Sequence, residues 1–256
     1  MKKETNKSLN QSFGLIGFPL SHSYSKKHFD RKFIELGLDY SFHLFEIRQI
    51  DEIKEIIHSH KNLKGFCVTM PYKQEILKYL DKLSSTAKAC GNVNCVKIIR
   101  QNSNIELQGY NTDAYGFEHS LLNQLCLSKI QNAYILGSGG VSKTIKHILD
   151  KHNIPSKIVS RNPKEEQISY DEMNQTFCNN ALFVNASPIG MHSLEHKMPN
   201  IDLNKINSTH QIFDLIYNPS PTLLMKECEK RGAKTIDGSQ MLYQQAEKAW
   251  EIWQSK

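Results

Sequence analysis

Apolar positions along the first half of the chain follow the two periods that distinguish helices from strands. Phe29, Phe33 and Leu36 recur at helical spacing and stop at Gly37, whereas apolar and polar residues alternate over 40–44. The pattern predicts strands at 13–17, 40–44 and 65–69, a helix carrying the four isoleucines between 50 and 57, a helix after Pro71, and extended segments at 93–99 and 105–110. This half is therefore expected to form an alternating α/β domain.

The second half repeats the alternation after a helix over about 114–126. Apolar runs near positions 133, 157, 181, 212 and 234 predict strands, which intervening helices would connect into a mostly parallel sheet. A last helix is expected over about 239–253, where apolar residues recur at helical spacing. We expect this helix to pack back on the first domain. A chain of 256 residues fits two domains of modest size better than one.

The strand predicted near residue 133 ends in a glycine-rich loop that is typical of nucleotide sites. Gly137 and Gly139 permit a tight turn and close approach of the backbone, and the following helix would direct its free amides at a pyrophosphate. Ser142 stands where the usual fingerprint has its third glycine. A strand-to-helix turn needs glycine with or without a ligand, so a plain turn remains the alternative.

The residue after the next predicted strand indicates which dinucleotide would bind. Enzymes that use NAD carry an acidic residue there, which bonds the ribose hydroxyls. This chain has Arg161, with Lys164 close behind. A guanidinium can grip a 2′-phosphate with two hydrogen bonds, so the sequence predicts NADP.

Composition argues against several other classes of protein. The formal net charge of +6 suits an anionic ligand, but the basic residues are spread along the chain, unlike those of a nucleic-acid-binding face. The six cysteines lack the spacing of a zinc site or a disulfide framework, so we expect no metal and a reducing cytoplasm. Residues 1–11 lack the apolar run of a secretion signal and are expected to be flexible, and no segment is long enough to cross a membrane.

Polar clusters follow several apolar runs, where ligands bind in parallel sheets. They lie at 21–25, 69–73, 91–94 and 111–113. Each has a structural alternative, since serine, threonine and aspartate commonly cap helices and most lysines are solvated at the surface. A single cluster therefore does not establish a site.

The order of the motifs along the chain is more specific than any one of them. The serine cluster, the glycine loop and the segments 68–73, 91–94, 111–113, 185–191, 214–219 and 238–246 together resemble the shikimate dehydrogenase family. The resemblance implies a two-domain α/β fold: an N-terminal α/β substrate domain with a parallel-rich sheet, and a Rossmann-like NADP-binding domain, with the active site in the cleft between them. The implied limits are 12–113, completed by 237–256, for the first domain and 114–236 for the second.

The resemblance also implies a reaction and its catalytic residues. The family reduces 3-dehydroshikimate to shikimate with NADPH, reversibly, in the biosynthesis of chorismate and the aromatic amino acids. Lys73 would give a proton to the ketone oxygen as hydride reaches the carbonyl carbon. Asp113 would pair with Lys73 and contact a substrate hydroxyl.

Binding residues are implied by the same matches. Ser23 and Ser25 would hold the substrate carboxylate, and its hydroxyls would bond to Thr69, Asn94, Tyr217 and Gln245. The residues implied for NADP are Gly137, Ser138, Gly139, Gly140 and Val141 at the pyrophosphate, Ser160 and Arg161 toward the 2′-phosphate, Asn185 and Ser187 along the nicotinamide side, and Gly238 and Met241 in the same cleft. No metal, nucleic acid or membrane is expected as a partner, and the protein is expected to be a monomer or homodimer.

Two other functions remain open at this point. One is a quinate or shikimate dehydrogenase with relaxed cofactor use, although Arg161 argues against equal use of NAD. The other is a binding protein of the same fold that senses a pathway metabolite without turnover. Such a protein would have no need of a proton donor such as Lys73. The chain also departs from the family pattern at Lys26, Ala114, Ser160 and Gln240.

Overall fold

The structure, a computed structural model, describes residues 10–20, 23–102 and 104–255. The expected flexible start falls mostly on residues 1–9, which lie outside the described residues, as do Ser21 and His22 of the serine cluster. The chain divides into two compact units. Unit 1 runs to Thr112 and resumes at Ala246, and unit 2 runs from Asp113 to Gln245. The domain limits implied by the resemblance stay a prediction.

Unit 1 is built on a six-stranded sheet in the order β2-β1-β3-β5-β6-β4. The strands are β1 (Ser12–Gly17), β2 (Ser41–Glu46), β3 (Leu63–Val68), β4 (Lys82–Leu83), β5 (Cys95–Gln101) and β6 (Asn104–Tyr110). β1 is parallel to β2 and β3, whereas β5 is antiparallel to β3 and β6. The ends of β1 and β3 and the start of β5 therefore meet at one edge of the sheet.

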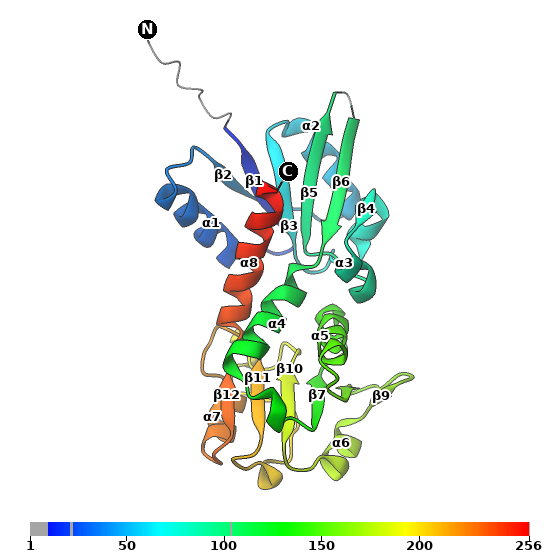
Figure 1. Ribbon diagram of the computed structural model, residues 1–256, viewed down its shortest axis with the longest axis vertical. Helices are drawn as coiled ribbons and strands as arrows, with labels where there is room; N and C mark the ends of the chain where they lie inside the picture. Colours follow the sequence, from blue (N-terminus) through cyan, green and yellow to red (C-terminus); the bar gives the residue numbers. More distant parts are fainter. Residues whose placement is uncertain (1–9, 21–22, 103, 256) are drawn as a thin grey trace. The chain divides into compact units, whose positions relative to one another are not determined.

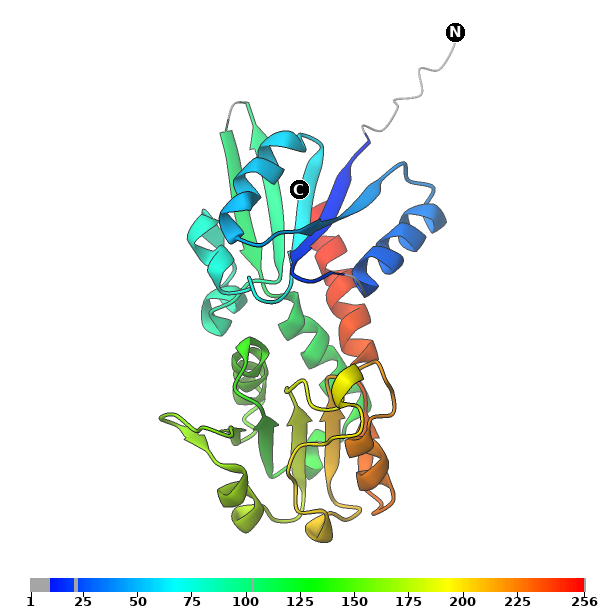
Figure 2. The same cartoon turned by 180° about the vertical axis from the view of Figure 1, so that it is seen from behind.

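Helices cover both faces of this sheet, as the opposite views in Figures 1 and 2 show. The helices are α1 (Tyr24–Glu35), α2 (Ile53–Ser59), α3 (Ser85–Cys90) and the second half of α8 (Ser239–Gln254), with 3-10 helices η1 (Ile50–Glu52) and η2 (Glu75–Tyr79). Phe13 of β1, Phe29 of α1 and Trp253 of α8 form an aromatic cluster. Gly65 permits this packing, because a Cβ there would lie 2.3 Å from Nε1 of Trp253. The final helix thus completes the core of unit 1.

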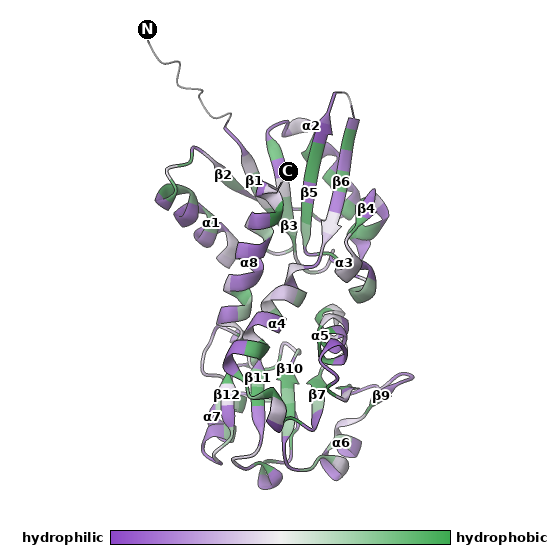
Figure 3. Cartoon of the chain, viewed as in Figure 1, coloured by the Kyte–Doolittle hydropathy of each residue, from purple (hydrophilic) through white to green (hydrophobic). Residues whose placement is uncertain are grey.

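Unit 2 contains a fully parallel sheet in the order β12-β11-β10-β7-β8-β9. Its strands are β7 (Asn132–Leu136), β8 (Ser156–Val159), β9 (Gln167–Ile168), β10 (Ala181–Asn185), β11 (Gln211–Asp214) and β12 (Lys234–Ile236). The strand order is that of a doubly wound dinucleotide-binding fold, and it reverses between β7 and β10. Figure 3 shows that β10 is mostly hydrophobic, as expected of a central strand. Ligands bind such sheets beyond the carboxyl ends of the strands at the point of reversal.

The helices of unit 2 are α4 (Thr112–Gln124, which begins at the last residue of unit 1), α5 (Gly140–Lys151), α6 (Tyr170–Thr176), α7 (Leu223–Glu229) and the first turns of α8, with 3-10 helices η3 (Leu127–Lys129), η4 (His192–Leu194) and η5 (Leu203–Lys205). The helix expected after Pro71 is the short 3-10 helix η2 in unit 1. Throughout the described ranges, the helices are too short or too polar to cross a membrane.

Candidate active site

The glycine loop of unit 2 lies between β7 and α5, at the reversal of strand order. Gly137 has a φ of +114°, and a Cβ there would lie 3.2 Å from the backbone of Ala186 and Ser187, so this position needs glycine. Gly139 and Gly140 are exposed, and nothing lies within 4 Å of a Cβ added to either. The exposed Ser138 precedes them. The loop is therefore shaped by packing at Gly137 and open to a ligand beyond it.

The start of α5 has the features that suit a bound phosphate. Its N-cap, Gly139, offers no side-chain hydrogen bond, and its first turn carries no acidic residue. Backbone amides and the positive end of the helix dipole then favour an anion. Ser142, in place of the third glycine, is buried and donates its hydroxyl to the carbonyl of Gly137 at 2.7 Å. The hydrogen bond of Ser142 therefore lies on the buried side of the loop, and the other side of the loop stays exposed.

Ser160 and Arg161 follow β8, beside the glycine loop. Ser160 is buried, and its Oγ lies 3.3 Å from Oγ of Ser138. The neighbouring Arg161 is exposed. The hydroxyl contact joins the end of β8 to the loop, and the guanidinium beside it has the chemistry to bind a phosphate.

A small cavity of about 120 Å³ opens at the carboxyl ends of β10 and β11. It is lined by Val141, Ala186, Ser187, Met191, Leu215, Ile216, Tyr217 and Asn218. Tyr217, which was expected to bind substrate, is one of these lining residues, and burial raises the pKa of its phenol. A mainly apolar cavity beside the glycine loop suits the ring of a nucleotide.

Three other implied residues of unit 2 are held by packing. Gly238 lies against the backbone of Leu215, whose carbonyl oxygen would be 2.0 Å from a Cβ at Gly238. Met241 is buried in α8, and Gln245 is buried with its Nε2 donating to the carbonyl of Leu242 at 3.0 Å. Packing alone explains the glycine at 238, so its role at a cofactor stays a prediction.

In unit 1, the serine cluster lies at the start of α1. Ser23 caps the helix by accepting a hydrogen bond from the amide of Lys26 at 3.3 Å, so the capping alternative is confirmed for this residue. A hydroxyl that accepts in this way keeps its own proton to donate. Ser25 is half-buried in the first turn.

Thr69 and Lys73 lie on the turn that follows β3. The amide of Tyr72 donates to the carbonyl of Thr69 at 3.0 Å, and the amide of Val93 donates to the carbonyl of Lys73 at 2.8 Å. The buried Tyr72 hydroxyl donates to the carbonyl of Ile47 at 2.8 Å. These bonds fix the backbone that carries the half-buried Lys73.

Asn94 directly precedes β5 at the same edge of the sheet. Its Oδ1 accepts the amide of Thr112 at 2.6 Å, and its Nδ2 donates to Oγ1 of Thr112 at 3.0 Å. Asn94 thereby caps α4, whose next residue is the buried Asp113. Sequence reasoning missed a second amide pair here: Nδ2 of Asn111 donates to Oδ1 of Asn92 at 2.8 Å. Both residues are buried, and the signal in the sequence was an amide in each of the motifs 91–94 and 111–113, which lie before β5 and after β6.

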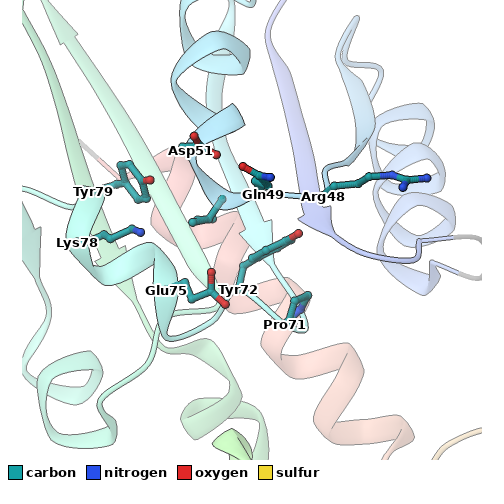
Figure 4. A pocket seen from close by; sticks show the side chains of 9 residues that line it. Arg48, Gln49, Asp51, Pro71, Tyr72, Glu75, Lys78 and Tyr79 are labelled. Atoms are coloured by element: carbon teal, nitrogen blue, oxygen red, sulfur yellow. The ribbon is translucent and has the colours of Figure 1, made fainter.

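A larger cavity of about 460 Å³ is lined in part by Pro71 and Tyr72, which belong to the turn that carries Lys73 (Figure 4). Its lining consists of Arg48, Gln49, Ile50, Asp51, Pro71, Tyr72, Glu75, Lys78 and Tyr79. Acidic and basic side chains are mixed in it, and none of the implied site residues is among them. Among residues 10–20, 23–102 and 104–255, no three acidic, cysteine or histidine side chains gather as a metal site would require.

Comparisons with known proteins indicate one family. Residues 15–96 match the family model described as the shikimate dehydrogenase substrate binding domain. A relative named shikimate dehydrogenase (NADP(+)) from Methanococcus maripaludis is 33% identical over 256 residues, covering 94% of this chain and 90% of the relative. A chorismate mutase/shikimate 5-dehydrogenase fusion protein from Clostridium acetobutylicum has a TM-score of 0.85 at 32% identity, covering 96% of this chain and 92% of that one. A shikimate dehydrogenase solved in complex with NADP+ has a TM-score of 0.80 at 32% identity, covering 96% and 90%. The chain belongs to the shikimate dehydrogenase family.

Proposed function

We propose that this protein catalyses the reversible, NADPH-dependent reduction of 3-dehydroshikimate to shikimate. Family membership and the relatives named for NADP(+) support the reaction and the cofactor. The observation that carries the proposal is that Thr69, Lys73 and Asn94 lie at one edge of the unit 1 sheet. Two backbone hydrogen bonds of 2.8 Å, from Val68 to Asn94 and from Val93 to Lys73, join the segments that hold them.

The proposed cofactor site follows from the strand order of unit 2. The pyrophosphate would bind at the start of α5 and the 2′-phosphate at Arg161. Because Arg161 follows β8, on one side of β7, the nicotinamide end would lie on the other side, beyond β10 and β11. The cavity lined by Ser187, Leu215 and Tyr217 is at that end. When bound there, NADPH supplies the hydride for the reaction.

Lys73 is the proposed proton donor. Reduction of the ketone puts negative charge on its oxygen, and an ammonium group at that oxygen neutralises the charge as it forms. Proton transfer from a positioned side chain contributes about 10²- to 10⁴-fold in rate. Asp113 is proposed to pair with Lys73 and to accept a hydrogen bond from the substrate, so the two would act as a unit.

Hydroxyl and amide groups are the proposed substrate ligands. Ser23 and Ser25 would donate to the carboxylate. Thr69, Asn94, Tyr217 and Gln245 are the proposed partners of the ring hydroxyls. A site built this way rejects analogues that lack a hydroxyl, because one of its buried polar groups would lose its partner.

The role of Lys73 can be tested with a matched pair of variants. Lys73→Met keeps the length of the side chain and removes the ammonium, whereas Lys78→Met makes the same change at an exposed lysine of the same segment. We expect kcat for shikimate oxidation, followed as NADPH absorbance, to fall at least about 10²-fold in Lys73→Met and to stay within about twofold in Lys78→Met. Equal kcat values in the two variants would remove Lys73 from the mechanism.

We further propose that the protein works in the cytoplasm as a monomer or homodimer. All six cysteines are free thiols, two of them exposed, which suits a reducing compartment. Sedimentation equilibrium of the purified chain would distinguish the two states of assembly.

A further inference from the structure

Asp214 is a buried carboxyl group at the end of β11. Its side chain is fully buried, with a relative exposure of 0%. Oδ2 accepts a hydrogen bond from Oγ1 of Thr222 at 2.7 Å, and Oδ1 accepts from Nδ2 of Asn185 at 2.9 Å and from the amide of Ile216 at 3.1 Å. Burial raises the pKa of Asp214 to about 6, although these hydrogen bonds oppose the shift. Burying a carboxyl group is costly, and the three hydrogen bonds offset part of that cost.

Asn185 continues the hydrogen bonds from Asp214 to the next loop. Like Asp214, it has an exposure of 0%. Its Oδ1 accepts from Oγ and from the amide of Ser187, at 2.7 and 3.1 Å, and its Nδ2 also donates to the carbonyl of Ile189 at 3.1 Å. The side chain expected to bind the cofactor thus points into the protein and holds its own loop.

The two loops held in this way both line the 120 Å³ cavity. Ala186 and Ser187 belong to the loop after β10, and Leu215, Ile216 and Tyr217 belong to the loop after β11. Asp214 reaches the first loop through Asn185 and the second through the amide of Ile216. Thr222 fixes the carboxyl group from the other side and also caps α7.

We propose that Asp214 and Thr222 are positioning residues that set the separation of these two loops and thereby the fit of the nicotinamide ring between them. The inference rests on the proposed function only in taking NADP as the ligand. Neither side chain lines the cavity, so both would act through Asn185 and Ile216.

The role of Thr222 can be separated from simple stabilisation. Thr222→Val keeps the shape of the side chain and removes its hydroxyl, whereas Thr222→Ser keeps the hydroxyl. Binding is measured by titration calorimetry with two probes, NADP+ and adenosine 2′,5′-bisphosphate. The second probe carries the adenosine and 2′-phosphate of NADP but has no nicotinamide.

The proposal predicts that Thr222→Val raises the Kd of NADP+ by roughly five- to twentyfold. The Kd of adenosine 2′,5′-bisphosphate should stay within about twofold, and Thr222→Ser should bind both probes nearly as the wild type does. Asp214→Asn, examined where it remains folded by circular dichroism, should show the same selective loss.

Other outcomes would overturn the proposal. If both probes lose affinity together, or if neither does while the melting temperature falls, Asp214 and Thr222 serve the fold alone. A wild-type protein that binds NADP+ without oxidising shikimate would contradict the proposed function and leave the positioning role supported by the binding data. A wild type that binds neither probe would contradict both.

Discussion

Asn94 and Asn111 show how buried amides arrange the residues that the proposed reaction uses. Asn94 caps α4 through Thr112, and Asn111 bonds to Asn92 across 19 positions of sequence. The two pairs join the loop before β5 to the chain after β6. Thr112 therefore starts α4 from a fixed point, and Asp113 is the second residue of that helix.

Replacing Asn111 with alanine should destabilise the protein. Oδ1 of the buried Asn92 would lose a donor, which typically costs about 1–3 kcal/mol. Urea unfolding measures the difference. Asn123→Ala is a matched control, because its amide lies on the exposed side of α4, where changes stay within about 0.5 kcal/mol. Equal losses in the two variants would show that the Asn92–Asn111 bond contributes nothing specific.

Single residues could be assigned from the sequence where a motif names them, but their contacts could not. Gly137 was expected at a tight turn, and its positive φ confirms that turn. Asn185 was expected at the cofactor, yet its amide is turned inward to Asp214, 29 positions away. Such a partner depends on which strands become neighbours, and no local pattern carries that information.

Among the elements, the alternation of strands and helices was the part of the fold most open to prediction. Long apolar runs such as β7 and β10 are recognisable because burial on both faces demands them. The segment around 163–180 carried no motif, and it forms the two-residue β9 and the seven-residue α6. Elements this short repeat the hydrophobic period too few times to be recognised in the sequence, and they owe their formation to packing against neighbours.

The junction of β10, β11 and α7 should depend on pH through Asp214. Its pKa is about 6 in the folded protein and 3.8 when unfolded, so the folded state holds the proton more tightly. The resulting stability is fully present below pH 3.8 and is lost as the pH rises through 6. Asp237 lies close enough to add to the shift, and the Cys228 thiol, whose pKa burial raises to about 12, stays neutral in this range.

Comparison with Asp214→Asn isolates this effect, because the titration of other groups cancels. The free energy of unfolding of the wild type, relative to the variant, should fall by up to about 3 kcal/mol between pH 4 and pH 7. Urea unfolding of both proteins at four pH values in this range gives the difference. A relative stability that is constant or rises with pH would contradict the raised pKa.

At the scale of the whole molecule, each unit has its own sheet and core, and the chain returns to the first unit after completing the second. The return is made by α8, whose last part packs on Phe13 and Phe29 through Trp253. Helical spacing predicted the helix. The close approach at Gly65 that seats Trp253 could not be predicted, since it joins residues 188 positions apart.

The most direct test of the proposed function is the cofactor and substrate selectivity of the wild-type enzyme. Purified protein is given shikimate or quinate with NADP+ or NAD+, and reduced nicotinamide is followed by absorbance. We predict turnover of shikimate with NADP+, with a kcat/KM at least about tenfold higher than with NAD+, because Arg161 favours the 2′-phosphate. The kcat/KM for quinate should also be at least about tenfold lower, because the proposed hydroxyl and amide ligands are matched to shikimate. Folded protein that binds shikimate and NADP+ but turns over neither substrate would contradict the account and favour a metabolite-binding role.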